Sequence, residues 1–273
     1  MMTESIGAFR RTQAGLALLA VSLLAGAEMA RAVGTNDLAG SVRTASPPPG
    51  YGLVWSDEFD GSALDTNKWM YRTDSKHWST QRPENVQVTN GVLRLVLRKE
   101  VAGNKDYTGA GVISRPSFRY GYYEARFKVP STKGWHTSFW LMWHDGLGGT
   151  DPQATKQEID ICENDSNRPT RYGLVVHRWR PEPHKGFGHL LVTTPDLSAD
   201  FHVWGCEFTP EAVTFYFDNE LKQTVDATQF SHSDQHIWLT SIASHLGGTD
   251  KVDDAGLPTF AEFDWVRYYG KKK

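Results

Sequence analysis

The sequence contains very little cysteine: Cys162 and Cys206 are the only two in 273 residues. Two cysteines cannot form a four-cysteine zinc site, and they allow one disulfide at most. Both lie in apolar segments typical of strands, where a thiol behaves as a small hydrophobic side chain. We therefore expect two buried free thiols, with a disulfide between them as the alternative, and neither cysteine resembles a catalytic nucleophile.

Other features are missing as well. No segment shows the spacing of an amphipathic helix over any length. The formal net charge is −3 and the only basic block is Lys271–Lys273, so nucleic acid is not an expected partner. The sequence has neither a glycine-rich phosphate loop nor clustered histidine ligands, which argues against a phosphate hydrolase or a metal-dependent hydrolase. We expect no cofactor for catalysis.

The amino-terminal segment has the composition of an export signal. Arg10 and Arg11 form a short basic region, Ala14–Ala27 is apolar, and cleavage is expected after Ala32. The apolar run is short for a membrane span, so residues 1–32 predict a secreted or periplasmic protein with no membrane contact after cleavage. Residues 33–50 are small, polar and proline-rich, as in a flexible linker.

From residue 51 to residue 270 the sequence predicts one all-β domain. Short alternating apolar runs recur between turn signals such as Asn90–Gly91 and Asp218–Asn219. Many short strands with almost no helix favour an antiparallel β-sandwich. The predicted strands are Val86–Val88, Val92–Leu97, Tyr122–Val129, Ser138–Trp143, Tyr172–Trp179, Val203–Phe208, Ala212–Asp218, Ile237–Ala243 and Phe260–Tyr269.

One further strand concentrates three carboxylates in the six residues from Glu158 to Glu163. A buried strand rarely contains so much charge, because unpaired buried charge is costly. Side chains alternate along a strand, so Glu158 and Asp160 share one face and Glu163 falls on the other. A β-bulge at Ile161–Cys162 would return Glu163 to the acidic face.

Two carboxyl groups about 5 Å apart are what a retaining glycosidase needs, one as nucleophile and one as acid/base. A concave sheet would let the long side chains of Glu158 and Glu163 converge, with Asp160 hydrogen-bonded between them. A calcium site and a solvent-facing acidic stripe are the alternatives. The ten tryptophans and ten tyrosines, several of them next to histidines, suit sugar rings with an apolar face and polar edges.

With these landmarks the sequence resembles glycoside hydrolase family 16 over about residues 53–269. The most specific element is the acidic strand, which matches the family's bulged E-x-D-x-x-E pattern. The other matching segments are Trp55–Gly61, Asn90–Leu93, Tyr120–Arg126, Phe139–Met142, Phe201–Gly205 and Phe263–Tyr269. The resemblance implies a concanavalin-like jelly roll of two curved antiparallel sheets with a sugar-binding groove on the concave side. It makes residues 51–270 the catalytic domain.

The resemblance also implies the activity and the roles of the acids. It implies an endo-acting, retaining hydrolase of a β-linked polysaccharide. Glu158 is then the nucleophile, Asp160 the assisting carboxylate and Glu163 the acid/base.

Residues outside the acidic strand are further candidates for the site. Trp140 is the expected stacking platform, and His177 matches a position where family members present a side chain to the cleft. Asn85, Trp135 and Trp179 are weaker candidates for sugar contacts. For all five a purely structural role is the alternative.

The resemblance further implies a structural calcium ion away from the groove. The matching ligands are Glu58, the carbonyl of Gly91 and Asp264, all of them oxygen donors as calcium prefers. Simple surface acids are the alternative.

The polysaccharide is left open between a β-glucan and a red-algal galactan such as agar, porphyran or carrageenan. The Leu239–Gly248 segment and the loop Trp143–Gln157 differ from the patterns of laminarin-cleaving relatives, which favours a galactan. A basic cluster just after the acidic strand suits an anionic sugar substituent, with a solvated loop as the alternative. It consists of Arg168, Arg171, Arg178, Arg180, His184 and Lys185.

Two other functions stay open at this point. A transglycosylase would share the first half-reaction, and a non-catalytic carbohydrate-binding module would share the jelly roll. We expect a monomer.

Overall fold

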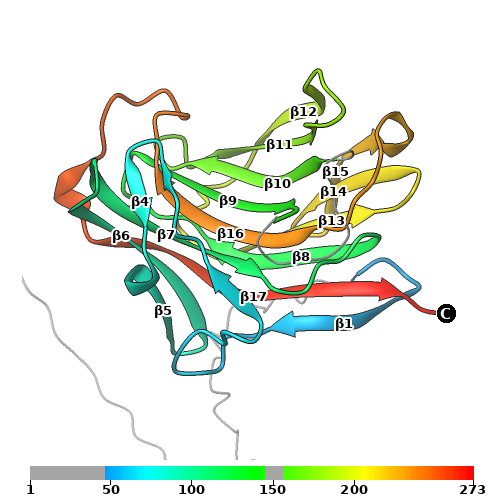
Figure 1. Ribbon diagram of the computed structural model, residues 1–273, viewed down its shortest axis with the longest axis horizontal. Coiled ribbons are helices and arrows are strands. Elements are labelled where there is room, and N and C mark those ends of the chain that lie inside the picture. Colours follow the sequence, from blue (N-terminus) through cyan, green and yellow to red (C-terminus); the bar gives the residue numbers. More distant parts are fainter. Residues whose placement is uncertain (1–46, 145–155) are drawn as a thin grey trace, which may run out of the picture. The chain divides into compact units, whose positions relative to one another are not determined.

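The computed structural model describes residues 47–144 and 156–273 (Figure 1). The predicted signal peptide, most of the predicted linker and most of the Trp143–Gln157 loop lie outside these residues. No helix in the described residues has the length and apolar character to cross a membrane.

Nearly all regular structure in these residues is strand. The first strands are β1 (Tyr51–Asp57), β2 (Trp69–Tyr71), β3 (Ser75–Lys76), β4 (Ser79–Gln81), β5 (Val86–Thr89), β6 (Val92–Ala102), β7 (Lys105–Ser114), β8 (Gly121–Lys128) and β9 (Trp135–Met142). The later ones are β10 (Gln157–Asp165), β11 (Arg171–Arg178), β12 (Lys185–Thr193), β13 (His202–Phe208), β14 (Ala212–Phe217), β15 (Glu220–Asp226), β16 (His236–Ala243) and β17 (Thr259–Lys271). Short 3₁₀ turns are η1 (Pro83–Asn85), η3 (Ala227–Gln229) and η4 (Asp254–Gly256).

These strands form two curved layers (Figure 1). In the outer sheet the order is β5–β6–β17–β8–β13–β14–β15, and β1 pairs with the far half of β17. In the inner sheet the order is β12–β11–β10–β9–β16–β7–β2. All of these pairs are antiparallel, and the predicted jelly-roll sandwich is confirmed. The short strand β4 adds a parallel pair with β7.

The core lies between the two sheets and follows the alternation of the strands. On β9, Phe139 and Leu141 are fully buried, as is Ile159 on β10, and Tyr123 and Phe127 of β8 meet them from the outer sheet. Cys162 and Cys206 also lie buried in this core as free thiols, as predicted. The opposite face of β9 and β10 is therefore left for polar and aromatic side chains.

All nine segments predicted from alternation are strands, whereas β7, β12 and β15 were missed, as were β1 and the short strands β2, β3 and β4. β7 contains Gly109 and Gly111, which interrupt the apolar pattern. Gly109 has a packing reason, since a Cβ there would lie 2.5 Å from the carbonyl oxygen of Ser241. β12 is also interrupted by glycine, and β15 is a mostly polar strand at the sheet edge. Alternation is weak where a strand packs by its backbone or lies at an edge.

The two predicted turns are hairpin loops with backbone angles that demand particular residues. Asn90 and Gly91 have φ of 53° and 71°, and Asp218 and Asn219 have φ of 48° and 67°. Asparagine, aspartate and glycine tolerate this left-handed region better than other residues. The turn sequences therefore fix the register of β5 with β6 and of β14 with β15.

Candidate active site

The acidic strand β10 contains the predicted bulge. Its pairing with β9 continues to Asp160, skips Ile161 and resumes at Cys162. The register with β11 slips by one residue over the same stretch. The extra residue turns Glu163 to the face that bears Glu158, while Ile161 and Cys162 are buried in the core.

On this face the inner sheet forms an open groove of about 500 Å³. All three acids line it, together with Trp140 of β9, Thr240 of β16 and side chains of the Arg72–His77 and Trp179–Glu182 segments. The acids are not equally accessible, because the Asp160 side chain is 3% exposed and that of Glu163 is 34% exposed. The bulged strand therefore places Glu158 and Glu163 on either side of the buried Asp160.

Glu158 is held by two donors. The indole Nε1–H of Trp179 donates to Oε2 of Glu158 at 2.5 Å. Burial raises the pKa of Glu158, while the hydrogen bonds from Trp179 and Asp160 act to lower it. Burial and the charges of Glu158 and Glu163 raise the pKa of Asp160 well above its usual range. Asp160 is thus the protonated partner that donates to the Glu158 carboxylate.

Glu163 is held by His136, which lies between two carboxylates. Its Nε2 is 3.3 Å from Glu163 Oε1, and its Nδ1 is 2.9 Å from Asp165 Oδ1. Burial acts to lower the pKa of His136, but the two acids together raise it to about 9. Burial would likewise raise the pKa of Glu163, but the hydrogen bond and charge of His136 lower it below its ordinary value. Protonated His136 therefore keeps Glu163 ionised in the free protein.

A second histidine lies beside Asp160. His177 is opposite Glu158 on β11, and its Nε2 is 3.4 Å from Asp160 Oδ2. Its Nδ1 is 3.0 Å from Nε2 of His184, whose ring stacks on Trp179 with centroids 4.1 Å apart. Burial and His184 lower the pKa of His177, so its ring is neutral at pH 7. His177 is therefore a neutral side chain that lies next to Asp160 at the side of the groove.

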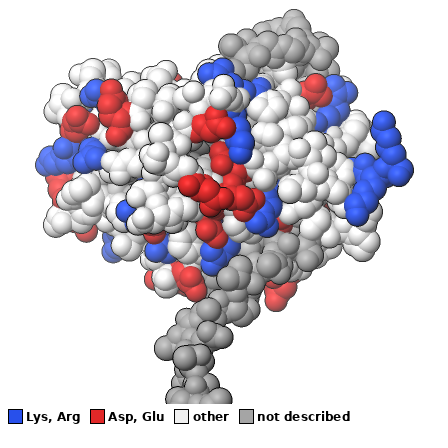
Figure 2. All heavy atoms as spheres, turned by 90° about the horizontal axis from the view of Figure 1, so that it is seen from below, with Lys and Arg blue, Asp and Glu red and all other residues white. Residues whose placement is uncertain are grey.

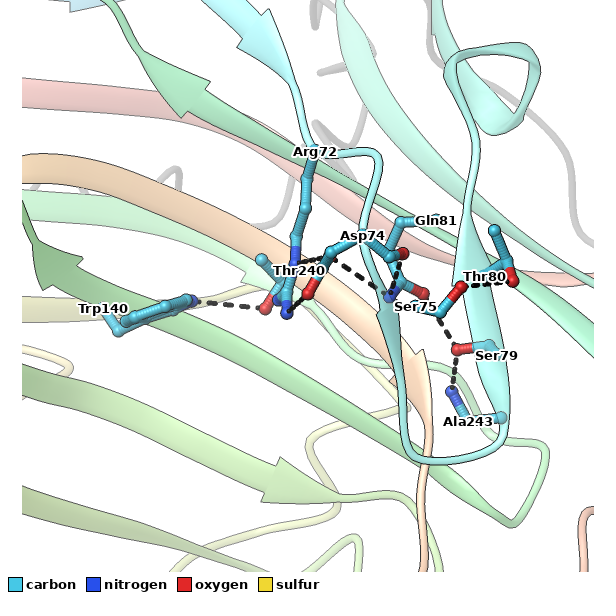
Figure 3. Close-up of polar contacts among 9 residues, drawn as sticks. All are labelled: Arg72, Asp74, Ser75, Ser79, Thr80, Gln81, Trp140, Thr240 and Ala243. Atoms are coloured by element: carbon cyan, nitrogen blue, oxygen red, sulfur yellow. Dashed lines mark hydrogen bonds and ion pairs between the residues drawn. The ribbon is translucent and has the colours of Figure 1, made fainter. Parts of the chain in front are cut away.

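The part of the groove wall formed by β9, β16 and the segment after β2 contains aromatic and cationic side chains. The Trp140 ring packs against Trp238 with centroids 4.5 Å apart, and its Nε1–H donates to Thr240 Oγ1 at 3.3 Å. Arg72 reaches the same region and donates to both carboxylate oxygens of Asp74, at 2.6 and 2.9 Å. Figure 3 shows Arg72 beside Thr240 and Trp140, with Asp74 linked onward to Gln81. Part of the Trp140 ring remains exposed to the groove.

Two predicted sugar-binding residues do not reach the groove. Trp135 is 1% exposed and packs in a core cluster with Leu97 and Val252, because it has the parity of the core-facing residues of β9. Asn85 is 2% exposed, and its amide donates to Thr108 and to the Gly109 carbonyl within the fold. Both assignments are wrong: these side chains are structural.

The predicted calcium ligands are engaged elsewhere. Glu58 forms a two-pronged ion pair with Arg267, at 2.9 and 2.7 Å, and Asp264 pairs with Arg126 at 2.5 Å. The third, Gly91, lies in the hairpin turn between β5 and β6. The described residues hold no cluster of three or more acidic, histidine or cysteine side chains arranged for a metal. The arginines already neutralise both carboxylates, so these side chains do not fit a calcium site.

Paired charges of this kind are seen on the face that lies below the view of Figure 1. Figure 2 shows acidic side chains gathered near the middle of that face, with basic side chains beside them.

Sequence reasoning missed several groove residues, among them His136 and Arg72. His136 shares strand parity with Trp140, so the alternation that predicted one side chain in the groove also predicts the other. Arg72 follows a very short strand, β2, and gives no pattern from which its position could be inferred.

Comparison with known proteins agrees with this geometry. The family model described as "Beta-porphyranase A-D, GH16 domain" matches residues 54–270. A beta-glucanase of Rhodothermus marinus is 31% identical over 251 residues, which cover 81% of this chain and 86% of that protein. A kappa-carrageenase of Pseudoalteromonas carrageenovora is 27% identical, over 79% of this chain and 63% of its own length.

Solved structures show the same fold. A mutant of SCLam, a non-specific endo-β-1,3(4)-glucanase from family GH16, superposes with a TM-score of 0.72 at 28% identity, over 83% of this chain and 97% of that chain. The bulged acidic strand, the open groove and a family match over most of the described domain lead to one conclusion. The chain belongs to glycoside hydrolase family 16, and it is a glycosidase.

Proposed function

We propose that the protein is an endo-acting, retaining hydrolase of a β-linked polysaccharide, and that its substrate is a red-algal galactan of the porphyran type. The observation that supports the chemistry most strongly is the bulge in β10, which puts Glu158, Asp160 and Glu163 in one open groove. An open groove admits a chain in its middle, as internal cleavage requires. The porphyranase description of the matching family model supports the substrate.

In the first step, Glu158 attacks the anomeric carbon and the glycosidic bond to the leaving sugar breaks. Asp160 keeps its proton and donates a hydrogen bond to Glu158, which helps Glu158 to stay ionised, and Trp179 donates a second hydrogen bond to Oε2 of Glu158. In the second step, Glu163 removes a proton from a water molecule as the water oxygen bonds to the anomeric carbon, and the bond between that carbon and Glu158 breaks.

The acid of the first step is the Glu163–His136 pair. Glu163 alone is ionised in the free protein, but His136 holds a proton on Nε2 next to its carboxylate. The proton passes through Glu163 to the departing oxygen, and it returns when Glu163 deprotonates water. Asp165 holds His136 in place through Nδ1.

Sugar rings would stack on the two tryptophans exposed to the groove. Trp140 lies opposite Asp160 on β9, and Trp179 is 37% exposed beside Glu158. Cationic side chains interspersed with the aromatic ones suit a galactan with acidic substituents better than a neutral glucan. They are Arg72, Lys76, Lys156 and Arg180.

The export signal predicted in residues 1–32 supports an activity outside the cytoplasm, and we propose that the protein acts there as a monomer. No cofactor takes part in the steps above.

Release of reducing ends from a panel of polysaccharides tests the proposal. Porphyran, agarose, carrageenans, laminarin and mixed-linkage glucan would each be incubated with the purified protein. We expect porphyran to be cut fastest, with oligosaccharides rather than single sugars as early products. Release from none of them by folded protein would contradict hydrolysis, and products longer than the starting oligosaccharide would indicate transglycosylation instead.

A further inference from the structure

A second cavity, of about 250 Å³, adjoins the groove. Glu163 and His136 line both cavities, whereas Glu158 lines only the groove. The second cavity therefore lies beyond the acid/base, on the side away from the nucleophile. Its outer wall consists of Arg168 and Arg171 from the β10–β11 hairpin and His189 from β12.

Its two arginines are held by the backbone of one turn. The amide of Asn164, which is completely buried, donates to the carbonyls of Arg171 at 2.9 Å and Arg168 at 3.5 Å. The amide N–H of Arg171 donates to the Arg168 carbonyl at 3.3 Å. These hydrogen bonds therefore fix the backbone positions of both arginines on the same rim of the cavity.

The loop after β16 closes this rim. The amide of Asn167 donates to the Gly247 carbonyl at 2.6 Å, which ties the loop to the β10–β11 turn. Gly248 has φ of 75°, and a Cβ there would lie only 3.0 Å from Nη2 of Arg168. Glycine at this position lets the Arg168 guanidinium lie against the loop. The Gly247–Gly248 pair therefore shapes the cavity wall.

The charges inside the cavity are unevenly paired. Its acids, Glu163 and Asp165, both face His136 on the inner wall. Neither Arg168 nor Arg171 has an ion pair with any side chain in the part of the chain that the structure describes. Unpaired guanidinium groups at a cavity rim are suited to a planar or tetrahedral anion, which they bind through parallel N–H donors.

We propose that this cavity binds a sulfate half-ester on a sugar of the leaving group. The position follows from the chemistry, because the acid/base protonates the oxygen of the leaving group and the cavity lies beyond it. The proposal rests on the proposed hydrolysis and adds where along the chain a sulfated sugar must sit. Arg168 and Arg171 bind the sulfate oxygens, and His189 approaches from the facing strand.

Binding by an inactive variant tests the subsite separately from turnover. Glu158→Gln would be titrated by calorimetry with purified porphyran oligosaccharides and with the same oligosaccharides after desulfation. We expect the sulfated form to bind more tightly. Adding Arg168→Ala and Arg171→Ala should weaken the preference by about tenfold for each arginine, since each contributes a charge-assisted hydrogen bond. Arg115→Ala, which removes an exposed arginine outside both cavities, is the control and should keep the preference.

Turnover provides the second arm. The ratio of kcat/KM for sulfated and desulfated polysaccharide should fall in the double arginine variant and stay at the wild-type value in the control. An unchanged preference in both arms would overturn the subsite while leaving the proposed hydrolysis intact. If the arginine variants lose the preference for binding the sulfated form, but neither they nor the wild type hydrolyses any polysaccharide, the result would support the subsite and contradict the proposed function. A carboxylated oligosaccharide bound as tightly as the sulfated one would overturn the assignment to sulfate.

Discussion

The two faces of β9 and β10 are built from the same strands and differ in almost everything else. The core face presents Phe139, Leu141 and Ile159, which are fully buried among other apolar side chains. The groove face presents the three acids together with His136 and Trp140, and His136 lies 3.3 Å from Glu163. The core face contributes stability through apolar packing, whereas the charges on the groove face need specific partners to offset the cost of desolvating them.

The difference shows how the groove can contain so many carboxylates. The buried face fixes the backbone of β10, bulge included, so the acids are positioned without having to pack. Each acid then has a specific partner that offsets its desolvation: Trp179 for Glu158, and His136 for Glu163. Asp160, the most buried, holds the proton. Substitutions on the two faces should therefore separate activity from stability.

The largest effect is expected on the groove face. Glu158→Gln removes the proposed nucleophile with almost no change in shape, so kcat should fall by about 10⁴-fold. The melting temperature should stay close to that of the wild type, because the lost charge was not needed for packing. Reducing-end release and thermal unfolding of the same preparation measure both. Hydrolysis at the wild-type rate would end the assignment of Glu158.

The opposite pattern is expected on the core face. Phe139→Ala leaves a cavity in the main core and should lower the free energy of unfolding by about 3–5 kcal/mol. kcat per folded molecule should change little at a temperature where the variant is folded. Denaturant unfolding and active-site titration test this. A loss of kcat as large as that of Glu158→Gln would show that the faces are not separable.

A smaller, pH-dependent effect is expected for His136→Asn. Folding raises the pKa of His136 from 6.5 to about 9, so its contribution to stability is complete below about pH 6.5 and is lost as the pH rises through about 9. The stability advantage of the wild type over the variant should be about 3 kcal/mol larger at pH 6 than at about pH 10. Denaturant unfolding at the two pH values measures it.

The same variant should change the pH profile of kcat/KM. In the wild type the basic limb reports the loss of the His136 proton, whose pKa is about 9. In the variant the carboxyl of Glu163 must hold the proton alone, and a carboxyl loses it at lower pH, so the basic limb should move to lower pH. His202→Asn, which alters a histidine paired with Asp218 on the outer sheet, is the control and should leave the limb in place. An unmoved limb in His136→Asn would contradict the Glu163–His136 pair as the acid.

The smallest effect is expected from a chelator. Arg267 and Arg126 neutralise Glu58 and Asp264, so we expect the melting temperature to be unchanged by excess EDTA. Calorimetric scans with EDTA and with added calcium test this. A fall of several degrees with EDTA, reversed by calcium, would show that the ion displaces these arginines.

Much of the fold and the acidic strand could be predicted from the sequence. Alternation located the strands that bury one face, and the parity of Glu158, Asp160 and Glu163 required a bulge that is present. Parity also separates Trp140 from Trp135, whose assignment to the groove was wrong for that reason.

Other parts of the site depend on contacts between distant segments and could not be inferred. Arg72 reaches the groove from a strand of three residues, and the pairing of Glu58 with Arg267 spans most of the domain. The second cavity needs the β10–β11 turn, β12 and the loop after β16 together. The basic cluster predicted as one unit is divided, with Arg168 and Arg171 in that cavity and Arg180 in the groove.

The most direct measurement traps the covalent intermediate. Glu163→Gln would be mixed with an aryl β-glycoside of the cleaved oligosaccharide, whose leaving group departs without an acid, so the first step proceeds and the second is slowed. Peptide mapping by mass spectrometry should then find the sugar attached to Glu158. Attachment to any other residue, or direct hydrolysis with inversion of the anomeric carbon, would contradict the double displacement proposed for this groove.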